Sequence, residues 1–261
     1  MSSIKLGAQL YTLRDYIKTY EECEETFKFL NSIGINVIQI SGIGPIPTDK
    51  VAYLVEKYNM DVCVTHTSFD RMLTDLDTVM KEHKMMGCDT LGIGGMPDKY
   101  RENTESIKEF IKVTSEIGKR MHDNGLQFAY HNHSFEFAKL EGDRIIDMLV
   151  DGLNPETTSF VLDTHWLQKG GVNIIEWLKK LEGRCDILHL KDYAVAPGEN
   201  NGYITECGSG NINFEEVIKA ADATGVKHLC VEQDTWPLGF DSVDYCMKKS
   251  FDHLSQYLDL K

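Results

Sequence analysis

Four segments of the chain join an apolar run to a polar residue at its end: LQFAYHNH (126–133), SFVLDTHW (159–166), CDILHLKD (185–192) and KHLCVEQD (227–234). Each run is short and carries few charges, as expected of a strand that is buried on both faces. The polar residue comes at the carboxyl end of each run. We therefore predict four parallel strands whose ends bring chemically active side chains to one place.

The rest of the chain extends this pattern into a regular alternation of strands and helices. Predicted strands cover 5–11, 36–41, 61–66, 89–94, 126–131, 157–162, 185–190 and 227–232. Amphipathic stretches lie between them, and several end at a glycine suited to a helix C-cap: Gly34, Gly87, Gly125 and Gly225. The length of 261 residues is close to the roughly 250 of one (β/α)₈ barrel. We predict an α/β fold, a single (β/α)₈ TIM barrel forming one domain over 1–261.

The charge and composition narrow the range of functions. The formal net charge is −14, which disfavours binding to nucleic acid because phosphate neutralisation requires clustered Lys and Arg. No apolar stretch is long enough to suggest a membrane span, and the N-terminus lacks the pattern of a signal peptide. The seven cysteines include no CxxC pair and favour a reducing compartment. We expect a cytoplasmic enzyme with a small-molecule substrate; barrels of this size often form homodimers, although no helix face indicates an interface.

The four strand ends predict a site for a divalent cation. His131, Asp163, His189 and Glu232 offer two imidazoles and two carboxylates, one from each of four neighbouring strands. Metal ligands must converge on the ion, and neighbouring strand ends of a barrel allow this. A single histidine at a strand end is more often an ordinary hydrogen-bonded side chain. Four such residues together favour the metal site, since burying several polar groups without a partner is costly.

The motifs HNHSFEF, LDTHW, HLKD, ECGSGNINF and VEQD, in this order, resemble those of the xylose-isomerase-like sugar phosphate isomerase/epimerase superfamily. GAQLYTLRD near the N-terminus and THTSFD at the third strand are similar to the same group. The resemblance implies a barrel that holds a divalent cation, with Mn²⁺ expected first and Mg²⁺, Co²⁺ or Zn²⁺ as alternatives. It places the ligands on His131, Asp163, His189 and Glu232, where the first is His although Glu is common in the superfamily.

This departure bears on the expected mechanism. In many epimerases of the superfamily, two metal-bound glutamates on opposite sides of the substrate exchange a proton next to a polarised carbonyl. Glu232 can keep this role here, whereas the opposite side needs Glu136 or His133 as the second catalytic group, and Glu136 could instead join the metal shell. The leading expectation is a metal-dependent isomerase or epimerase of a sugar, sugar phosphate or keto-sugar. The alternative is a lyase or dehydratase that acts on an oxidised sugar or a 3-oxo-glycoside. A more remote one is a non-catalytic sugar-binding barrel.

Five further residues are candidates for substrate binding. His66 ends the third strand, Trp166 is suited to stacking on a sugar face, and Lys191 lies two residues after a predicted ligand. Glu206 lies in the ECGSGN motif, and Arg14 is the natural partner of an anionic group. For each of them an ordinary structural role, as a wall residue, ion pair or solvated side chain, remains the alternative.

The longest stretch without a predicted helix or strand is 191–213, after the seventh strand. In a barrel this segment is a loop on the face that carries the active site, and long loops there are often functional. We expect it to cover the substrate.

Overall fold

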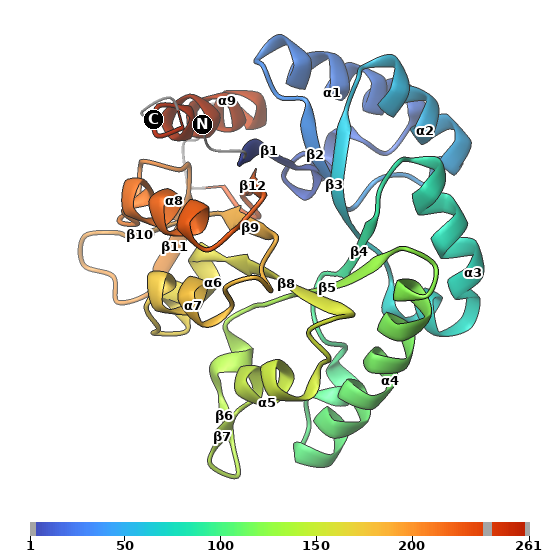
Figure 1. The fold of residues 1–261 in the computed structure, drawn as a ribbon. Coiled ribbons are helices and arrows are strands. Elements are labelled where there is room, and N and C mark those ends of the chain that lie inside the picture. The colour runs from blue at the N-terminus through green and yellow to red at the C-terminus, as the bar shows by residue number, and fades with distance from the viewer. Residues whose placement is uncertain (1–3, 237–241, 259–261) are drawn as a thin grey trace.

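The computed structural model describes residues 4–236 and 242–258. Eight parallel strands close into a barrel in the order β1-β12-β9-β8-β5-β4-β3-β2, and helices surround it (Figure 1). The prediction of a (β/α)₈ barrel is thereby confirmed. Within the described ranges, no helix has both the length and the apolar character needed to cross a bilayer.

The barrel strands match all eight predicted ones. They are β1 (Lys5–Gln9), β2 (Val37–Ile40), β3 (Asp61–His66), β4 (Thr90–Ile93), β5 (Gln127–His131), β8 (Thr158–Asp163), β9 (Ile187–Leu190) and β12 (His228–Val231). The first strand is shorter than predicted, because the side chain of Gln9 accepts a hydrogen bond from the N–H of Tyr11 and starts the 3₁₀ helix η1 (Leu10–Tyr16).

The helices follow the strands in the expected alternation. They are α1 (Tyr20–Ser32), α2 (Thr48–Lys57), α3 (Phe69–Met85), α4 (Thr104–His122), α5 (Ile145–Gly152), α6 (Thr164–Lys169), α7 (Ile174–Lys180), α8 (Phe214–Ala223) and α9 (Val243–Ser255), with short 3₁₀ helices η2 (Asp98–Tyr100) and η3 (Phe135–Phe137). Gly34, Gly87, Gly125 and Gly225 all adopt positive φ. This conformation, which glycine enters at little cost, lets the chain leave a helix and turn into the next strand.

Two hairpins lie outside the barrel. One consists of β6 (Lys139–Leu140) and β7 (Asp143–Arg144), the other of β10 (Asp192–Val195) and β11 (Gly202–Thr205). The second hairpin occupies much of 191–213, so the expectation of an irregular loop there was wrong. The carboxylate of Asp192 accepts hydrogen bonds from the backbone N–H groups of Gly208, Gly210 and Ile212, which holds the chain after the hairpin in place.

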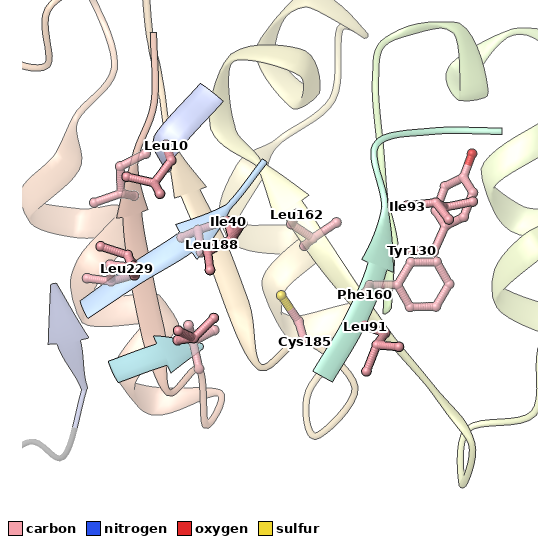
Figure 2. Packing of buried hydrophobic residues seen from close by; sticks show 14 of the residues in the cluster. Leu10, Ile40, Leu91, Ile93, Tyr130, Phe160, Leu162, Cys185, Leu188 and Leu229 are labelled. Atoms are coloured by element: carbon pink, nitrogen blue, oxygen red, sulfur yellow. The ribbon is translucent and has the colours of Figure 1, made fainter. Parts of the chain in front are cut away.

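Side chains alternate between the outside and the inside of the barrel. Outward residues such as Tyr130, Phe160 and Leu188 pack in the large core between strands and helices (Figure 2). Tyr130 links strand and helix layers, since its ring lies 5.9 Å from that of Phe110 on α4 and 6.1 Å from that of Phe160.

A smaller cluster fills the inside of the barrel and includes Ala129, Val161, Ile187 and Cys230. Strand side chains alternate with a period of two, so the residues two positions further along face the same interior. Those residues are His131, Asp163, His189 and Glu232. The strand period therefore places all four predicted ligands in the next layer, at the carboxyl end of the barrel.

Candidate metal centre

The four predicted ligands meet in the structure. One donor atom from each of His131, Asp163, His189 and Glu232 lies within 4.8 Å of the others. None of the four side chains is more than 5% exposed. Strand register explains the arrangement, because Asp163 on β8 pairs directly with His189 on β9, and His189 in turn pairs with Cys230 on β12.

The donor atoms that face one another make no hydrogen bond. These are Nε2 of His131, Oδ2 of Asp163, Nδ1 of His189 and Oε2 of Glu232. Asp163 Oδ2 lies 3.6 Å from His131 Nε2 and 3.8 Å from His189 Nδ1, and Glu232 Oε2 lies 2.8 Å from His189 Nδ1. Buried polar atoms without partners are rare because desolvating them is costly. The two carboxylate oxygens have only ion-pair contacts, with Lys191 at 2.9 Å, and a divalent cation would bind them together with both imidazole nitrogens. This donor set therefore fits a metal ion.

The outer nitrogens of both histidines are held by acceptors. Nδ1 of His131 lies 3.2 Å from the carbonyl oxygen of Gly94, and Nε2 of His189 lies 2.6 Å from Oε1 of Gln39. A carbonyl or amide oxygen accepts a hydrogen bond, so each outer nitrogen carries a proton. The inner nitrogen of His131 keeps its lone pair, since burial lowers the pKa of this imidazole. Burial acts in the same direction on His189, but Glu232 and Asp163 raise its pKa to about 9, so its inner nitrogen would release a proton when a cation binds. Such contacts fix the tautomer and the ring orientation that a metal ligand requires.

Replacing Gln39 by Leu should weaken the affinity for a divalent cation by about 10–100-fold, because His189 loses the acceptor that orients its ring. The variant is measured by titrating the metal into chelator-treated protein and following binding calorimetrically. Gln168→Leu, at an exposed position on α6, is the matched control. Equal affinities for wild type and the Gln39 variant would show that the Gln39 amide does not orient His189 for metal binding.

Lys191 brings a buried positive charge to the same place. Its Nζ lies 2.9 Å from Oδ2 of Asp163, Oε2 of Glu232 and Oδ2 of Asp234. The contact with Asp234 is a hydrogen bond, whereas the other two are ion pairs without hydrogen-bond geometry. Burial would lower the pKa of Lys191, but the three carboxylates raise it, so the side chain stays charged.

The pKa values of the three carboxylates around Lys191 shift in different directions. Burial acts to raise the pKa of Asp163 and of Glu232, but the charge of Lys191 holds both well below the usual range. For Asp234, burial and the charge of Glu232 prevail and raise the pKa to about 6. With His189 in the neutral form that a metal ligand requires, three carboxylates face one ammonium group, and a divalent cation would balance the two negative charges that remain.

A cavity of about 550 Å³ opens above these groups. Its lining comes from the ends of barrel strands and the loops after them: Gln9, Tyr11, Arg14, His66, Gly94, His131, His133, Lys191, Glu232, Asp234 and Thr235. The volume is in the range of small-molecule sites. The cavity thus places the candidate ligands His131 and Glu232 in contact with a space that a small substrate could enter.

Three of the five substrate-binding candidates, His66, Lys191 and Arg14, line the cavity. Trp166 lies beside it, with its ring 5.1 Å from that of His133 and 5.2 Å from Nζ of Lys191. Arg14 also donates hydrogen bonds to the carbonyl oxygens of Tyr11 and Asp234, at 2.9 Å each. Its guanidinium therefore ties the segment after β1 to the segment after β12.

Glu206 lies away from the cavity. Its carboxylate accepts hydrogen bonds from Sγ of Cys246 at 3.1 Å and from Oγ1 of Thr205 at 2.9 Å, and it faces Lys249 on α9. Of the segment 191–213, which we expected to cover the substrate, Lys191 alone belongs to the cavity lining.

The two candidates for the second catalytic group differ in position. His133 lines the cavity, and its Nδ1 makes no hydrogen bond. Glu136 is fully buried and does not line the cavity: it accepts hydrogen bonds from the hydroxyl of Tyr130 at 2.8 Å and from the backbone N–H of His133 at 2.9 Å. The carboxylate of Glu136 holds the turn that carries His133.

Glu136 should also make stability depend on pH. Burial raises its pKa from 4.5 to about 7, so the folded protein holds this proton more tightly than the unfolded chain, and stability falls as the pH rises from about 4.5 to 7. Glu136→Gln cannot ionise. Its free energy of unfolding should therefore rise relative to wild type by on the order of 3 kcal/mol across this interval. Urea denaturation at both pH values, with the exposed Glu102→Gln as control, measures the difference; parallel profiles would contradict it.

Two residues of the site were not singled out from the sequence. Gln39 is the one polar side chain in VIQI, a strand whose other residues are aliphatic, and an amide in such a strand indicates a specific buried partner. Asp234 lies two residues after Glu232 in VEQD. Because alternate residues of an extended chain face the same side, this spacing from a predicted ligand could have indicated that Asp234 lies at the site.

The fold and the site together define a (β/α)₈ barrel with a buried group of His, Asp and Glu suited to a divalent cation. A model of the xylose isomerase-like TIM barrel family matches residues 27–243. The chain belongs to this family.

Known proteins extend the comparison. Inosose dehydratase of Clostridium perfringens is 24% identical over 249 residues, which cover 88% of this chain and 70% of that protein. The crystal structure of a sugar phosphate isomerase/epimerase from Parabacteroides distasonis has a TM-score of 0.79 at 19% identity and covers 99% of this chain and 96% of its own. An L-ribulose 3-epimerase has a TM-score of 0.75 at 12% identity, covering 98% and 95%. At these identities, the two structures establish the fold alone.

Proposed function

We propose that the chain is a divalent-metal-dependent isomerase or epimerase that removes a proton from a carbon next to the carbonyl of a sugar or keto-sugar. The observation that carries the proposal is the convergence of four buried donor atoms, none of which makes a hydrogen bond, beneath a cavity of about 550 Å³. The relatives named as L-ribulose 3-epimerase and as inosose dehydratase support a sugar or a related polyol as the substrate class.

Carboxylates suit Mn²⁺ and Mg²⁺, and imidazoles suit Co²⁺ and Zn²⁺. For this mixed set of two imidazoles and two carboxylates we propose Mn²⁺, the ion that the family resemblance implies, with Mg²⁺, Co²⁺ and Zn²⁺ as alternatives. A bound cation would supply Lewis-acid polarisation of a carbonyl oxygen. His131, Asp163, His189 and Glu232 would hold it. Lys191 keeps its charge in the cavity wall and can donate a hydrogen bond to a substrate oxygen.

Glu232 and His133 are the proposed proton-transfer groups. Both line the cavity, and Nδ1 of His133 makes no hydrogen bond. Glu136 is proposed as a positioning residue instead, since both of its oxygens are occupied by Tyr130 and by the backbone of His133.

Replacing His133 by Phe should lower the rate of proton exchange by about 10²–10⁴-fold while the metal stays bound, because the ring shape is kept and the proton acceptor is lost. Exchange is followed by proton NMR of the substrate in D₂O. Glu136→Gln should lower the rate less. If the Glu136 variant loses more activity than the His133 variant, the roles assigned to these two residues are reversed.

A lyase or dehydratase is the second candidate. It is favoured by the similarity to inosose dehydratases and by His131 in the place where a second glutamate is common. Both reactions begin with removal of the same proton, so Glu232 keeps its role. They differ in the next step: an epimerase returns a proton to the carbon, and a lyase expels a leaving group.

The proposal is tested by elemental analysis of the purified protein together with deuterium exchange into ketoses and 3-oxo-sugars. Stoichiometric metal with exchange and epimer formation would support the isomerase. Exchange with loss of water or of an aglycone would support the lyase. Protein that binds no divalent cation after incubation with Mn²⁺, Mg²⁺, Co²⁺ and Zn²⁺ would contradict both.

The cellular setting remains a proposal. All seven cysteines are buried free thiols, which supports a reducing compartment such as the cytoplasm. We also propose a homodimer, which is tested by measuring the mass of the protein in solution by sedimentation.

A further inference from the structure

The segment that begins at the end of β1 forms one wall of the cavity above the metal centre. Gln9, Tyr11 and Arg14 line the cavity from this side. None of the three is a candidate metal ligand, and the proposed proton transfer uses none of them. Their chemistry therefore indicates what the substrate carries besides the reacting carbonyl.

Arg14 brings to this wall a positive charge without an acidic partner. Its guanidinium donates hydrogen bonds to the carbonyl oxygens of Tyr11 and Asp234, at 2.9 Å each, and lies 4.6 Å from the ring centre of Tyr11. Among the residues that the structure describes, no carboxylate lies within ion-pair distance of Arg14. A guanidinium group has five N–H donors. The two hydrogen bonds hold the group in place and leave the other donors for a ligand.

Gln9 adds a second donor to the same wall. The residue is fully buried, and its Oε1 accepts a hydrogen bond from the backbone N–H of Tyr11 at 3.1 Å. This bond fixes the orientation of the amide, so that Nε2 is the group left over, and Nε2 makes no hydrogen bond. Because buried amide groups normally find partners, an unused N–H group in a cavity wall indicates a ligand with an acceptor oxygen.

Both donors are attached to the backbone of one residue. Gln9 accepts a hydrogen bond from the N–H of Tyr11, and Arg14 donates one to the carbonyl oxygen of Tyr11. The nitrogen and the oxygen of one residue lie within roughly 4 Å of each other. The amide and the guanidinium therefore occupy neighbouring positions in the wall.

The charges of the site favour an anion at this wall rather than at Lys191. The ammonium group of Lys191 already lies 2.9 Å from Asp163, Glu232 and Asp234, and these three carboxylates would repel a further anion. They exceed Lys191 by two negative charges, which a divalent cation would balance. The positive charge of Arg14 would then remain uncompensated in the wall of the cavity.

We propose that Gln9 and Arg14 bind an anionic group of the substrate, a phosphate or a carboxylate, so that the enzyme acts on a sugar phosphate or a sugar acid. The planar guanidinium matches the oxygen atoms of both groups. The proposal rests on the proposed function, since it takes the cavity above the metal centre as the site of reaction. The substrate would lie with its carbonyl toward the metal ligands and its anionic group toward the end of β1.

The first experiment compares three ketoses with the same reacting carbons: D-fructose, D-fructose 6-phosphate and D-fructuronate. They differ only at the last carbon, which is an alcohol, a phosphate ester or a carboxylate. Deuterium exchange next to the carbonyl is followed with the Mn²⁺-loaded protein. The kcat/KM of at least one anionic substrate should exceed that of D-fructose by about 10–100-fold, as expected from hydrogen bonds to a charged group. The comparison of the two anionic substrates distinguishes phosphate from carboxylate.

The second experiment measures binding without reaction. D-glucitol, D-glucitol 6-phosphate and D-gluconate are open-chain polyols without a ketone, so they cannot undergo the proton exchange. Titration calorimetry with the Mn²⁺-loaded protein gives their affinities. At least one of the two anionic polyols should bind about 10–100-fold more tightly than D-glucitol.

Variants locate the effect. Arg14→Gln removes the charge and should bring the ratio of anionic to neutral substrate close to one, whereas a merely structural role of Arg14 would affect both substrates alike. Gln9→Glu keeps the oxygen that binds the N–H of Tyr11 but replaces the N–H donor by a negatively charged oxygen, and the ratio should fall at least about tenfold. Arg120→Gln, in the last turn of α4 with a side chain that is 57% exposed, is the control and should leave the ratio unchanged.

The outcomes separate this proposal from the proposed function. If the neutral compounds react and bind as well as the anionic ones, or if Arg14→Gln leaves the ratio unchanged because the anion coordinates the metal ion instead, the anion site is refuted and the proposed function stands. If calorimetry shows the preference and its loss in Arg14→Gln but no ketose exchanges, the anion site stands and the proposed function fails for ketoses. If no anionic compound binds or exchanges, the anion site is refuted as well.

Discussion

Asp163→Asn should abolish activity and lower the affinity for a divalent cation by more than about 100-fold, while the barrel stays folded. The substitution removes the carboxylate charge at the centre of the four donor atoms, where Oδ2 faces both histidines. It keeps the cap of α6, because Oδ1 of the amide can still accept the hydrogen bond from the N–H of Trp166 that Asp163 accepts at 3.1 Å. Loss of a direct ligand should reduce the metal affinity by more than the roughly 10–100-fold that follows from removing a residue that only orients a ligand.

Two further variants separate metal loss from unfolding. Asp163→Ala removes the ligand and the cap together and should cost an additional ~1 kcal/mol of stability. Asp98→Asn, with a side chain that is 93% exposed, is the control and should keep full metal content. Metal content is measured by elemental analysis after gel filtration. Stoichiometric Mn²⁺ in Asp163→Asn would refute the ligand set.

Lys191→Met should destabilise the metal-depleted protein by about 3–5 kcal/mol, the effect expected when one partner of a buried ion pair is removed. The substitution keeps much of the length of the side chain but leaves Asp163, Glu232 and Asp234 facing one another without the ammonium charge. A divalent cation should restore much of this loss. The increase in melting temperature on adding Mn²⁺ should therefore be larger in the variant than in wild type.

Chemical denaturation with and without chelator measures both quantities. Lys180→Met is the matched control, because Lys180 pairs with Asp147 at a position where its side chain is 41% exposed, and such surface pairs contribute about 0–1 kcal/mol. The double variant Lys191→Met/Asp234→Asn should recover part of the stability, since one of the uncompensated charges is gone. A Lys191→Met protein as stable as wild type would show that the three carboxylates do not depend on this ammonium group.

The strands and the ligand layer were predictable from the sequence for a simple reason. In a buried parallel strand the local pattern is enough to predict which way each side chain points. Apolar residues alternate between the outside and the inside of the barrel, and a polar residue two positions after an inward residue also points inward. His131 comes two positions after Ala129, and Asp163 comes two positions after Val161. No knowledge of distant contacts is needed to place these side chains.

The parts that sequence reasoning missed depend on contacts between distant segments. Gln39 becomes part of the site only because its side chain on β2 meets that of His189 on β9, 150 residues later in the chain. Glu206 belongs to a motif that suggested substrate contact, but α9 approaches from the C-terminal end and engages its carboxylate through Cys246. The hairpin of β10 and β11 is short, and its sequence contains the glycines typical of a loop.

The interior cluster below the metal centre has a consequence for how such enzymes change. Ala129, Val161, Ile187 and Cys230 line neither the cavity nor the group of donor atoms, yet each precedes a ligand by two residues along the chain. Their volumes set how far apart the strand ends stand, because packed interiors transmit strain. Altered preference for an ion or a substrate can therefore arise from exchanges such as Ala129→Val, which leave every reactive group of the site in place and change only the spacing between them.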